Sequence, residues 1–324
     1  MLRKAFVVGV AGWLAASTAW TADAQDYPSQ PIKVIVPLAA GGGIDAFARM
    51  FAKAIEADGS LAQPIVVTNM PGAGGAIGMR AVAEAESDGY TLLNFHSSVL
   101  TAPVTGQVDF GLEAFEPIAQ TGDQFIVLAV RNDSKYKTLQ DVIEQSRREP
   151  RSVLVATNLG AIAHFAPAMV SDAAGVEFKY VQVGGGAKAL ASVLGGHTDI
   201  AVFALAGFSK FRQNGVRGLV ILAPERHPDL PNIPTARELG YDVIASVPDW
   251  WLAPAGTPKD RIDKFADVLE KLMATQEIQS WLKSRMNDPV FIRGEALKEK
   301  MQEQYDHFDR IAESAGIKDA LKKK

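Results

Sequence analysis

Short apolar runs alternate with segments of helical periodicity along most of this chain. Residues 32–36 (IKVIV) predict a buried strand, and Phe47, Phe51 and Ile55 then mark one face of a helix. Seven further apolar runs predict strands at residues 65–67, 90–95, 125–130, 153–156, 178–183, 200–203 and 218–222. Such alternation is typical of parallel sheets covered by helices on both faces. We therefore expect an α/β fold with two doubly wound sheets.

Two stretches are predicted to cross between domains. Residues 125–130 follow a loop rich in Gly, Asp and Pro, and residues 242–254 form an extended segment bounded by proline. The strands and helices between them form a self-contained run. We predict a first domain from residues 25–124 and 251–324, and a second domain from residues 125–250 that includes the crossing segments. The cleft between two such domains is the expected ligand site.

The chain becomes mostly helical after the second crossing. Thr257 as N-cap and Pro258 at the first helical position predict a helix start. The last helix is predicted to stop at Gly316 and carries an apolar stripe that we assign to core packing, at Leu297, Met301, Tyr305, Phe308 and Ile311.

The first 24 residues have the order of a secretory signal peptide. Arg3 and Lys4 precede an apolar run at residues 5–16, and small residues follow, with predicted cleavage before Gln25. The run is shorter than the about 20 residues of a membrane span. The chain has no cysteine, which excludes disulfide scaffolds, thiol catalysis and cysteine-zinc sites. These features predict a periplasmic protein.

The net charge gives little attraction for polyanions. The formal net charge of the whole chain is −4. A mildly acidic protein has no bulk attraction for nucleic acid or for an anionic membrane. Neither is therefore expected as a partner.

Four strand-to-helix junctions are rich in glycine or other small residues, at residues 39–45, 71–78, 157–163 and 184–187. In parallel α/β sheets such turns emerge at the carboxyl ends of strands, where ligands bind. A helix N-terminus offers unpaired N–H groups and about half a positive charge, and glycine lets a ligand approach that backbone. Any single junction is explained by a tight turn alone. Four together predict a site for an anion such as a carboxylate, held without Lys or Arg.

Nucleotide and catalytic motifs do not fit the sequence. The glycines at residues 72–78 do not match G-x-G-x-x-G, and residues 184–188 lack the Lys-Ser/Thr ending of a phosphate loop. The five histidines show neither H-E-x-x-H nor metal-site spacing, and G-x-S-x-G is absent. We expect no cofactor, no metal and no catalytic residue.

Two histidines follow predicted strands on the cleft side. His96 stands beside Ser97 and Ser98, and His164 comes shortly after Thr157 and Asn158. We interpret both histidines as hydrogen-bonding or structural groups, and a general base is the alternative.

Asp45 and the tryptophan pair have structural alternatives. An aspartate at a helix start usually caps the backbone, and we expect this of Asp45. Trp250 and Trp251 must face opposite sides of an extended strand. Either both rings pack in the core, or one of them, for which Trp250 is the candidate, lines the cleft.

Several motifs recur together in one known family. They include YPSQPI at residues 27–32, GGGID at 41–45, NMPGAGGAIG at 69–78 and DGYTLL at 88–93. Later matches are GGA at 185–187, GG at 195–196 with Asp199, PTARELG at 234–240 and APAGTP at 253–258. In these motifs the chain resembles the periplasmic binding proteins of tripartite tricarboxylate transporters, called Bug receptors. The similarity covers nearly all of the predicted mature chain.

The resemblance implies a two-domain flytrap that closes on a small carboxylated solute. In that family the ligand carboxylate is held largely by backbone N–H groups and bridging waters, around the turn that here is residues 39–45. Side-chain contacts would come from residues 96–98 and 157–161. Together with the glycine turns this gives the candidate ligand-binding residues Leu38, Ala40, Gly41, Gly42, Gly43, Ile44, Asp45, Gly74, His96, Ser97, Ser98, Thr157, Asn158, Ala161, His164, Gly184, Gly185, Asp199 and Trp250.

The implied function is that of a monomeric receptor that passes its solute to membrane transporter subunits in a transient contact. The alternatives are a ligand sensor for a signalling partner and a secreted hydrolase that uses His96 or His164. The chain departs from the family at Ile44, where a polar residue is common, and at Val183-Gly184, where Tyr-Lys is common. We therefore expect a ligand with an apolar or aromatic body and one or two carboxylates, rather than a citrate-like acid.

Overall fold

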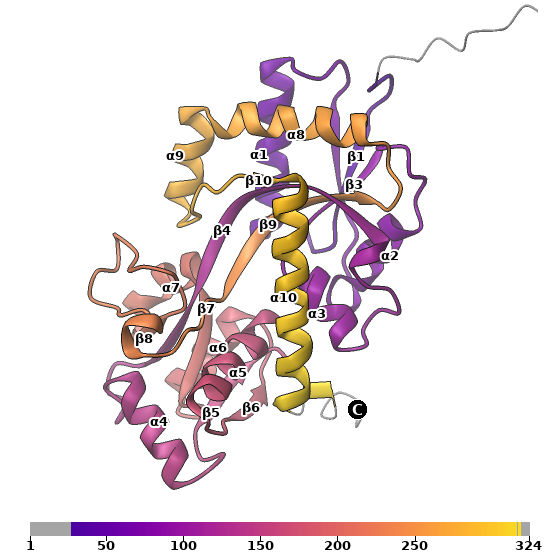
Figure 1. Cartoon of the computed structure of the whole chain (residues 1–324). Helices are drawn as coiled ribbons and strands as arrows, with labels where there is room; N and C mark the ends of the chain where they lie inside the picture. Colours follow the sequence, from indigo (N-terminus) through magenta and orange to yellow (C-terminus); the bar gives the residue numbers. More distant parts are fainter. Residues whose placement is uncertain (1–26, 316, 319–324) are drawn as a thin grey trace, which may run out of the picture.

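A computed structural model describes residues 27–315, 317 and 318 as two lobes joined by long strands (Figure 1). The predicted signal peptide lies outside the described residues. The first lobe contains β1 (Ile32–Val36), α1 (Gly43–Asp58), β2 (Ile65–Asn69), α2 (Ala76–Ala83), β3 (Thr91–Phe95), α3 (Ser98–Val104), α8 (Lys259–Met273), α9 (Gln276–Ser284) and β10 (Ile292–Arg293). The second lobe contains α4 (Leu139–Arg148), β5 (Leu154–Thr157), α5 (Ile162–Ala174), β6 (Lys179–Gln182), α6 (Gly186–Leu194), β7 (Ile200–Ala204), α7 (Leu205–Phe211) and β8 (Val216–Ile221).

Two strands and one helix belong to both lobes. The strands are β4 (Phe115–Arg131) and β9 (Ser246–Pro254), and the helix is α10 (Gly294–Ser314). The strands pair in the order β2-β1-β3-β9-β4-β7-β5-β6, with β8 and β10 also pairing with β4. The predicted domain boundaries, 124/125 and 250/251, therefore fall inside paired strands that continue through both lobes.

The sheets are mixed, whereas the sequence predicts parallel ones. The strands β1, β2 and β3 are parallel to one another, as are β5, β6 and β7. The strands β4 and β9 run antiparallel to each other and to β7 and β3. The reason is the double crossing: the chain leaves the first lobe along β4 and returns beside it along β9, so that the two strands must run in opposite directions.

Only the second half of β4 was predicted. Its apolar residues 125–130 pair with β7 and β8, but β4 begins ten residues earlier, at Phe115. The first half is rich in polar residues and contains Pro117, so it lacks a strand pattern. It pairs with β9 through two register shifts, at Pro117/Ala119 and Gln120/Gly122.

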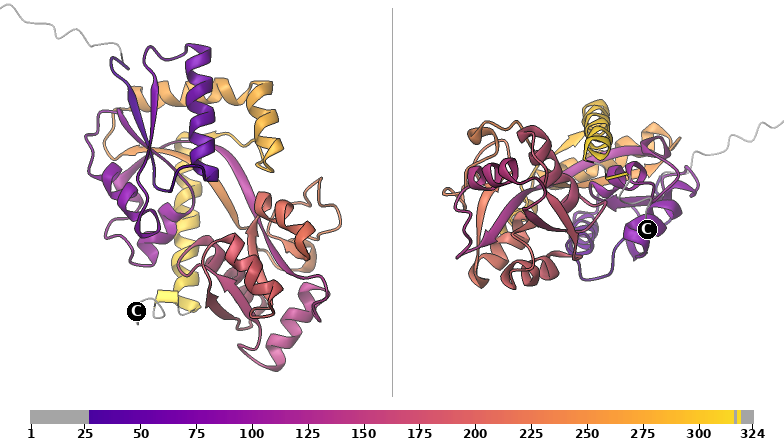
Figure 2. Two further views of the ribbon diagram at one scale, coloured as in Figure 1. Left: turned by 180° about the vertical axis from the view of Figure 1, so that it is seen from behind. Right: turned by 90° about the horizontal axis from the view of Figure 1, so that it is seen from below.

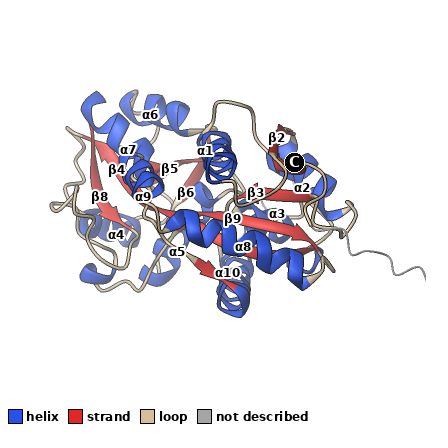
Figure 3. Cartoon of the chain, turned by 90° about the horizontal axis from the view of Figure 1, so that it is seen from above, coloured by secondary structure: helices blue, strands red, loops and turns tan. Residues whose placement is uncertain are grey.

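Helices cover both faces of each half of the sheet, as the sequence predicts (Figure 3). Trp251 packs with Phe51 and Phe265 against α1 and α8, with ring centroids 5.7 Å apart in both pairs. Trp250 lies in a second cluster, on the opposite face, that extends into both lobes. A third cluster lies under α6 and α7. Period-2 alternation along β9 thus sends adjacent tryptophans into different cores.

The last helix, α10, lies along both lobes (Figure 1, yellow). It packs on α3 of the first lobe and on α5 of the second, where the rings of Phe308 and Phe165 are 5.1 Å apart. The predicted stripe is confirmed as core, although Tyr305 is only partly buried. The predicted stop at Gly316 lies outside the described residues.

The start of α8 differs from its prediction. Thr257 is not the N-cap, because its Oγ1 donates to the Pro254 carbonyl at 2.7 Å, and Pro258 occupies the cap position. Among the described residues, no helix has the length and hydrophobicity that a membrane span requires.

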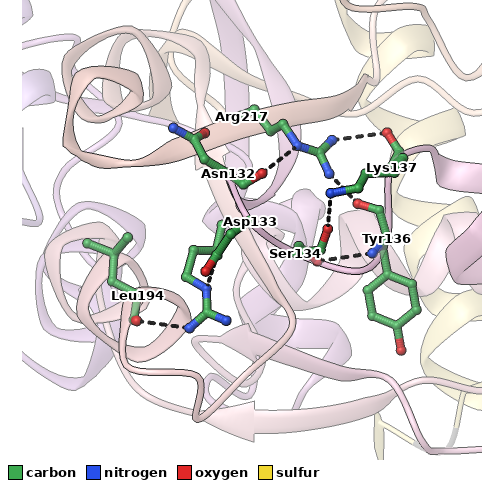
Figure 4. A network of polar contacts seen from close by, with 8 residues as sticks. Asn132, Asp133, Ser134, Tyr136, Lys137, Leu194 and Arg217 are labelled. Atoms are coloured by element: carbon green, nitrogen blue, oxygen red, sulfur yellow. Dashed lines mark hydrogen bonds and ion pairs between the residues drawn. The ribbon is translucent and has the colours of Figure 1, made fainter.

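Arg217 of β8 fixes the turn that follows β4 (Figure 4). Its guanidinium donates to the carbonyls of Asn132 (3.5 Å), Lys137 (3.0 Å) and Tyr136. This turn lies at the amino edge of β5 and β7, because Val130 pairs with Ile200 and Ile200 in turn pairs with Val155. The network therefore stabilises the edge of the second lobe that lies opposite the predicted ligand turns.

Candidate functional site

The ligand turns of each lobe emerge at the carboxyl edge of its three parallel strands. A side chain that the sequence did not single out, Gln107, lies close to both edges. A methyl group placed on Gly74 would lie 2.7 Å from Gln107 Oε1, and one placed on Gly160 would lie 2.7 Å from Gln107 Nε2. The Gly74 turn of the first lobe and the Gly160 turn of the second therefore approach the same side chain. An isolated exposed glutamine carries no local pattern that could have predicted this contact.

The PGAGG motif fits tightly against this edge of the first lobe. A methyl group on Gly75 would lie 2.6 Å from the Phe95 ring, and one on Gly78 would lie 2.9 Å from Pro37. Gly75 also has φ +103°, which disfavours other residues. These two glycines serve close packing next to β1 and β3, whereas Gly74 faces Gln107.

The turn from β1 into α1 presents open backbone. Residues 39–43 are exposed, and Gly42 is the N-cap of α1 without any side-chain cap. In the described part of the chain, the N–H groups of Gly42, Gly43 and Ile44 have no hydrogen-bond partner, as expected for the start of a helix. Figure 2 shows α1 with its lower end directed towards the second lobe. This end offers several donors for an anion.

Asp45 serves the backbone, as predicted. Its Oδ2 accepts the Gly41 N–H at 2.8 Å, and its Oδ1 accepts Arg49 Nε at 2.9 Å. Arg49 also donates to Asn69 Oδ1, and Asn69 Nδ2 donates to the Leu38 carbonyl. Burial opposes ionisation of Asp45, but these hydrogen bonds and the Arg49 charge hold its pKa below the usual value. The Gly41 N–H is therefore already paired, and the charge of Asp45 is balanced.

The other members of this turn contribute differently. The Ile44 side chain is buried in the core of the first lobe, which leaves its N–H as the group that can face a ligand. Leu38 is half-buried, and Ala40 is exposed at the turn. The departure at Ile44 is thus a change in core packing beneath the turn.

His96, Ser97 and Ser98 follow β3 at the same edge. His96 Nδ1 accepts the Ser98 N–H at 3.2 Å, and its ring lies 4.3 Å from that of Phe95. Burial lowers the pKa of His96 to about 4. Ser97 Oγ is buried without a hydrogen-bond partner among the described residues. A neutral His96 with its proton on Nε2 can donate to a carboxylate.

The turn after β5 repeats this arrangement in the second lobe. His164 Nδ1 accepts the Gly160 N–H at 3.3 Å, and its ring meets Tyr180 edge-on at 4.5 Å. Burial lowers the pKa of His164 to about 4. Thr157 Oγ1 is buried and, within the described chain, unpaired. Ala161 is the N-cap of α5 and provides no side-chain cap.

Gln182 and Lys188 complete the second-lobe turns, and the sequence pointed to neither. Gln182 Nε2 donates to Asn158 Oδ1 at 3.0 Å, so that the turn after β5 is tied to the end of β6. Gly184 donates its N–H to the Thr157 carbonyl at 3.3 Å, and Gly185 is the uncapped N-cap of α6. Lys188 lies over Gly184.

Two predicted residues lie away from these turns. Asp199 Oδ2 accepts the Leu154 N–H at 2.9 Å, at the amino end of β5 and therefore at the edge opposite Thr157. Trp250 is 0% exposed, and its Nε1 donates to Gln120 Oε1 at 3.2 Å. Asp199 therefore holds two strands together instead of lining the cleft. Of the two alternatives for the tryptophans, core packing of both rings is the one observed.

Residues 47–317 match the family model described as "Tripartite tricarboxylate transporter family receptor". The chain belongs to this family. The receptor is 34% identical to protein BugT of Bordetella pertussis (strain Tohama I) over 266 residues, which cover 79% of this chain and 80% of BugT. The family consists of substrate-binding receptors, and the resemblance seen in the sequence motifs is confirmed.

Solved structures share the receptor's fold. A TctC solute-binding protein from Polaromonas superimposes with a TM-score of 0.77 at 27% identity, covering 89% of this chain and 99% of that one. MatC from Rhodopseudomonas palustris with bound malate has a TM-score of 0.72 at 25% identity, covering 88% and 99%. The receptor is therefore a periplasmic solute-binding protein with the two-domain flytrap fold.

The two site histidines are expected to stay neutral over the physiological range. Their folded-state pKa of about 4 lies below the ordinary value of 6.5, so the stability that they contribute is present above pH 6.5 and lost as the pH falls towards 4. Side-chain ¹⁵N NMR, assigned with His96→Gln and His164→Gln, should show both rings protonated on Nε2 alone down to about pH 5. A titration near 6.5 in the free receptor would contradict this.

Proposed function

We propose that the receptor binds a small carboxylate between its lobes, through backbone N–H groups, and delivers it to membrane transporter subunits. The observation that carries the proposal is the uncapped starts of α1, α5 and α6, at the carboxyl edges of both lobes. The side chains of Thr138 and Thr275 cap α4 and α9. The starts of α8 and α10 are uncapped as well, so what sets α1, α5 and α6 apart is their position at the ligand turns. An uncapped helix start with its positive dipole end is a ready anion site.

The start of α1 is proposed to take the first carboxylate. Gly42 and Gly43 lack a Cβ that would keep a ligand away from the N–H groups, and Ile44 adds a third donor. A hydrogen bond to a charged group contributes about 1.5–3 kcal/mol, so two or three of them suffice for firm binding. Asp45 does not repel the anion strongly, because Arg49 pairs with it at 2.9 Å.

Neutral donors complete the proposed site. His96 Nε2, Ser97 Oγ and Thr157 Oγ1 each have a proton to give, and two of these atoms are buried without a partner in the described residues. Burying an unpaired hydroxyl costs free energy that a ligand oxygen would recover. MatC, which carries malate, supports a small carboxylate as the ligand class.

The body of the ligand is proposed to be apolar or aromatic. The strand β6 is followed by Val183-Gly184, so the tyrosine and lysine that are common in the family at this point are missing. We also propose that residues 1–24 are removed on export and that the mature receptor is a monomer whose contact with the transporter is transient.

A thermal-shift screen of carboxylic acids against the mature receptor tests this function. A ligand at 100 times its dissociation constant should stabilise the folded state by about 2.7 kcal/mol. The panel should pair aliphatic and aromatic acids with citrate, and mass spectrometry should recover each hit unchanged. Turnover of the hit would refute a pure receptor. Strong stabilisation by citrate alone would refute the apolar ligand body.

A further inference from the structure

Lys188 is a cation placed over the turn between β6 and α6. It is the third residue of α6, and its side chain folds back across Gly184. A methyl group on Gly184 would lie 3.3 Å from Lys188 Cδ and 3.9 Å from Nζ. Gly184 also has φ +95°, where glycine is favoured. The glycine at 184 therefore leaves room for the lysine chain to lie on the turn.

The ammonium of Lys188 is uncompensated, unlike the other charges around the ligand turns. Asp45 pairs with Arg49, and Arg80 pairs with Asp109 at 2.6 Å. The two site histidines are neutral. Lys188 is exposed, and among the described residues its Nζ forms no ion pair and no hydrogen bond. One formal positive charge thus stands free at the second-lobe edge.

Other unsatisfied groups gather at the same turn. Gly185 starts α6 without a side-chain cap, so the N–H groups of the first turn point outwards. The Thr157 carbonyl accepts the N–H groups of Val183 and Gly184, at 2.9 and 3.3 Å, which places the Thr157 residue directly beneath this turn. Its Oγ1 is buried without a partner among the described residues. A cation, free helix N–H groups and the residue that carries an unpaired buried hydroxyl thus lie at one turn.

We propose that Lys188 holds the second carboxylate of a dicarboxylate ligand and thereby selects dicarboxylic over monocarboxylic acids. This rests on the proposed function, in which the first carboxylate lies at the start of α1. Lysine acts as a compact point charge on a long stem, which suits one carboxylate oxygen at the rim of a closing site.

The test compares matched acids that differ only in the second carboxylate. Calorimetry first identifies the pair of acids whose size fits the site. The pairs are succinate and butyrate, adipate and hexanoate, and terephthalate and benzoate. For that pair, Lys188→Met should weaken the dicarboxylate by about 10-fold or more and the monocarboxylate by less than about 2-fold. Lys188→Arg should retain most of the preference. Lys210→Met, on the exposed end of α7, is the control and should change neither affinity.

The outcomes distinguish a failure of the proposed role of Lys188 from a failure of the proposed carboxylate-binding function. If the receptor binds these acids but Lys188→Met weakens both members of a pair equally, or neither, the lysine only covers the turn and the proposal is overturned. A receptor that prefers the monocarboxylate of every pair overturns it as well. If no carboxylate binds the unaltered receptor, the proposed function itself fails. Because Lys188 is exposed, the melting temperatures of the free variants should match that of the parent and exclude misfolding.

Discussion

Replacing Gly42 with leucine is expected to weaken carboxylate binding by about 100-fold or more while the receptor stays folded. Gly42 has φ −76° and ψ 175°, an extended conformation that leucine adopts without strain. A Cβ at this position would touch only the Ala39 carbonyl, at 3.4 Å, which is ordinary contact. The rest of the side chain would stand in front of the free N–H groups of Gly43 and Ile44 and exclude a ligand from them.

The measurement is calorimetric titration with the best acid from the screen, together with circular dichroism and thermal melting. Ala57→Leu is the matched control, because it adds a leucine side chain to the exposed far end of the same helix. It should bind like the parent receptor. Unchanged affinity in Gly42→Leu would remove the start of α1 from the site, and a lowered melting temperature would mean that the turn does not accommodate leucine as its backbone angles indicate.

The second large effect is expected from Asp249→Asn, which should stabilise the receptor at alkaline pH. Asp249 lies on β9 opposite Gly122, where the strands cross between the lobes, and it is 3% exposed. Burial raises the pKa of Asp249 from 3.8 to about 7, against the lowering effect of a 2.6 Å hydrogen bond from Asn287 Nδ2. The charge of Asp123 on the neighbouring strand raises the pKa of Asp249 further.

The sign of the effect follows from proton binding. Between pH 4 and 7 the folded state holds the proton on Asp249 and the unfolded state does not, so stability falls as the pH rises through this window. A pKa moved from 3.8 to about 7 corresponds to a loss on the order of 4 kcal/mol at pH 8. Asparagine has no charge to desolvate and still offers Oδ1 to Asn287, so the variant avoids this loss.

Urea unfolding of the parent and of Asp249→Asn at pH 8 and pH 4.5 measures the difference. We expect the variant to be more stable at pH 8, by up to about 4 kcal/mol, and most of this gain to disappear at pH 4.5. Asp306→Asn, at an exposed position on α10, is the control and should show no such pH dependence. A gain that is equal at both pH values, or a loss at pH 8, would show that the pKa of Asp249 is not raised in the folded receptor.

Local patterns predicted the elements that depend on local interactions. The first strand was predicted at residues 32–36 and observed at Ile32–Val36, because an apolar run that ends in a glycine turn has few other outcomes. The apolar face of α1 was predicted from Phe47, Phe51 and Ile55, and all three are buried. The role of Asp45 also followed from its place at the start of a helix.

Long-range contacts explain the features that the sequence did not predict correctly. The polar first half of β4 becomes a strand because β9, more than a hundred residues later, offers it hydrogen bonds. Asp199 follows a glycine pair that resembles a ligand motif, but its partner is Leu154 at the opposite edge of the sheet. Trp250 was a candidate for the cleft because alternation separates it from Trp251, and the tertiary structure provides a core on both faces of β9.

The sequence by itself determined the fold class, the family and the glycine turns at which an anion can meet free backbone N–H groups. These depend on short-range periodicity, on backbone conformations that glycine favours, and on motifs that lie within a few residues of one another. Only the tertiary structure decided which side chains reach those turns. No local sequence pattern predicted the positions of Gln107, Gln182 and Lys188. Gln107 and Gln182 are placed by packing between segments that are distant in the sequence. The direction of the Lys188 side chain over Gly184 is not specified by residue spacing.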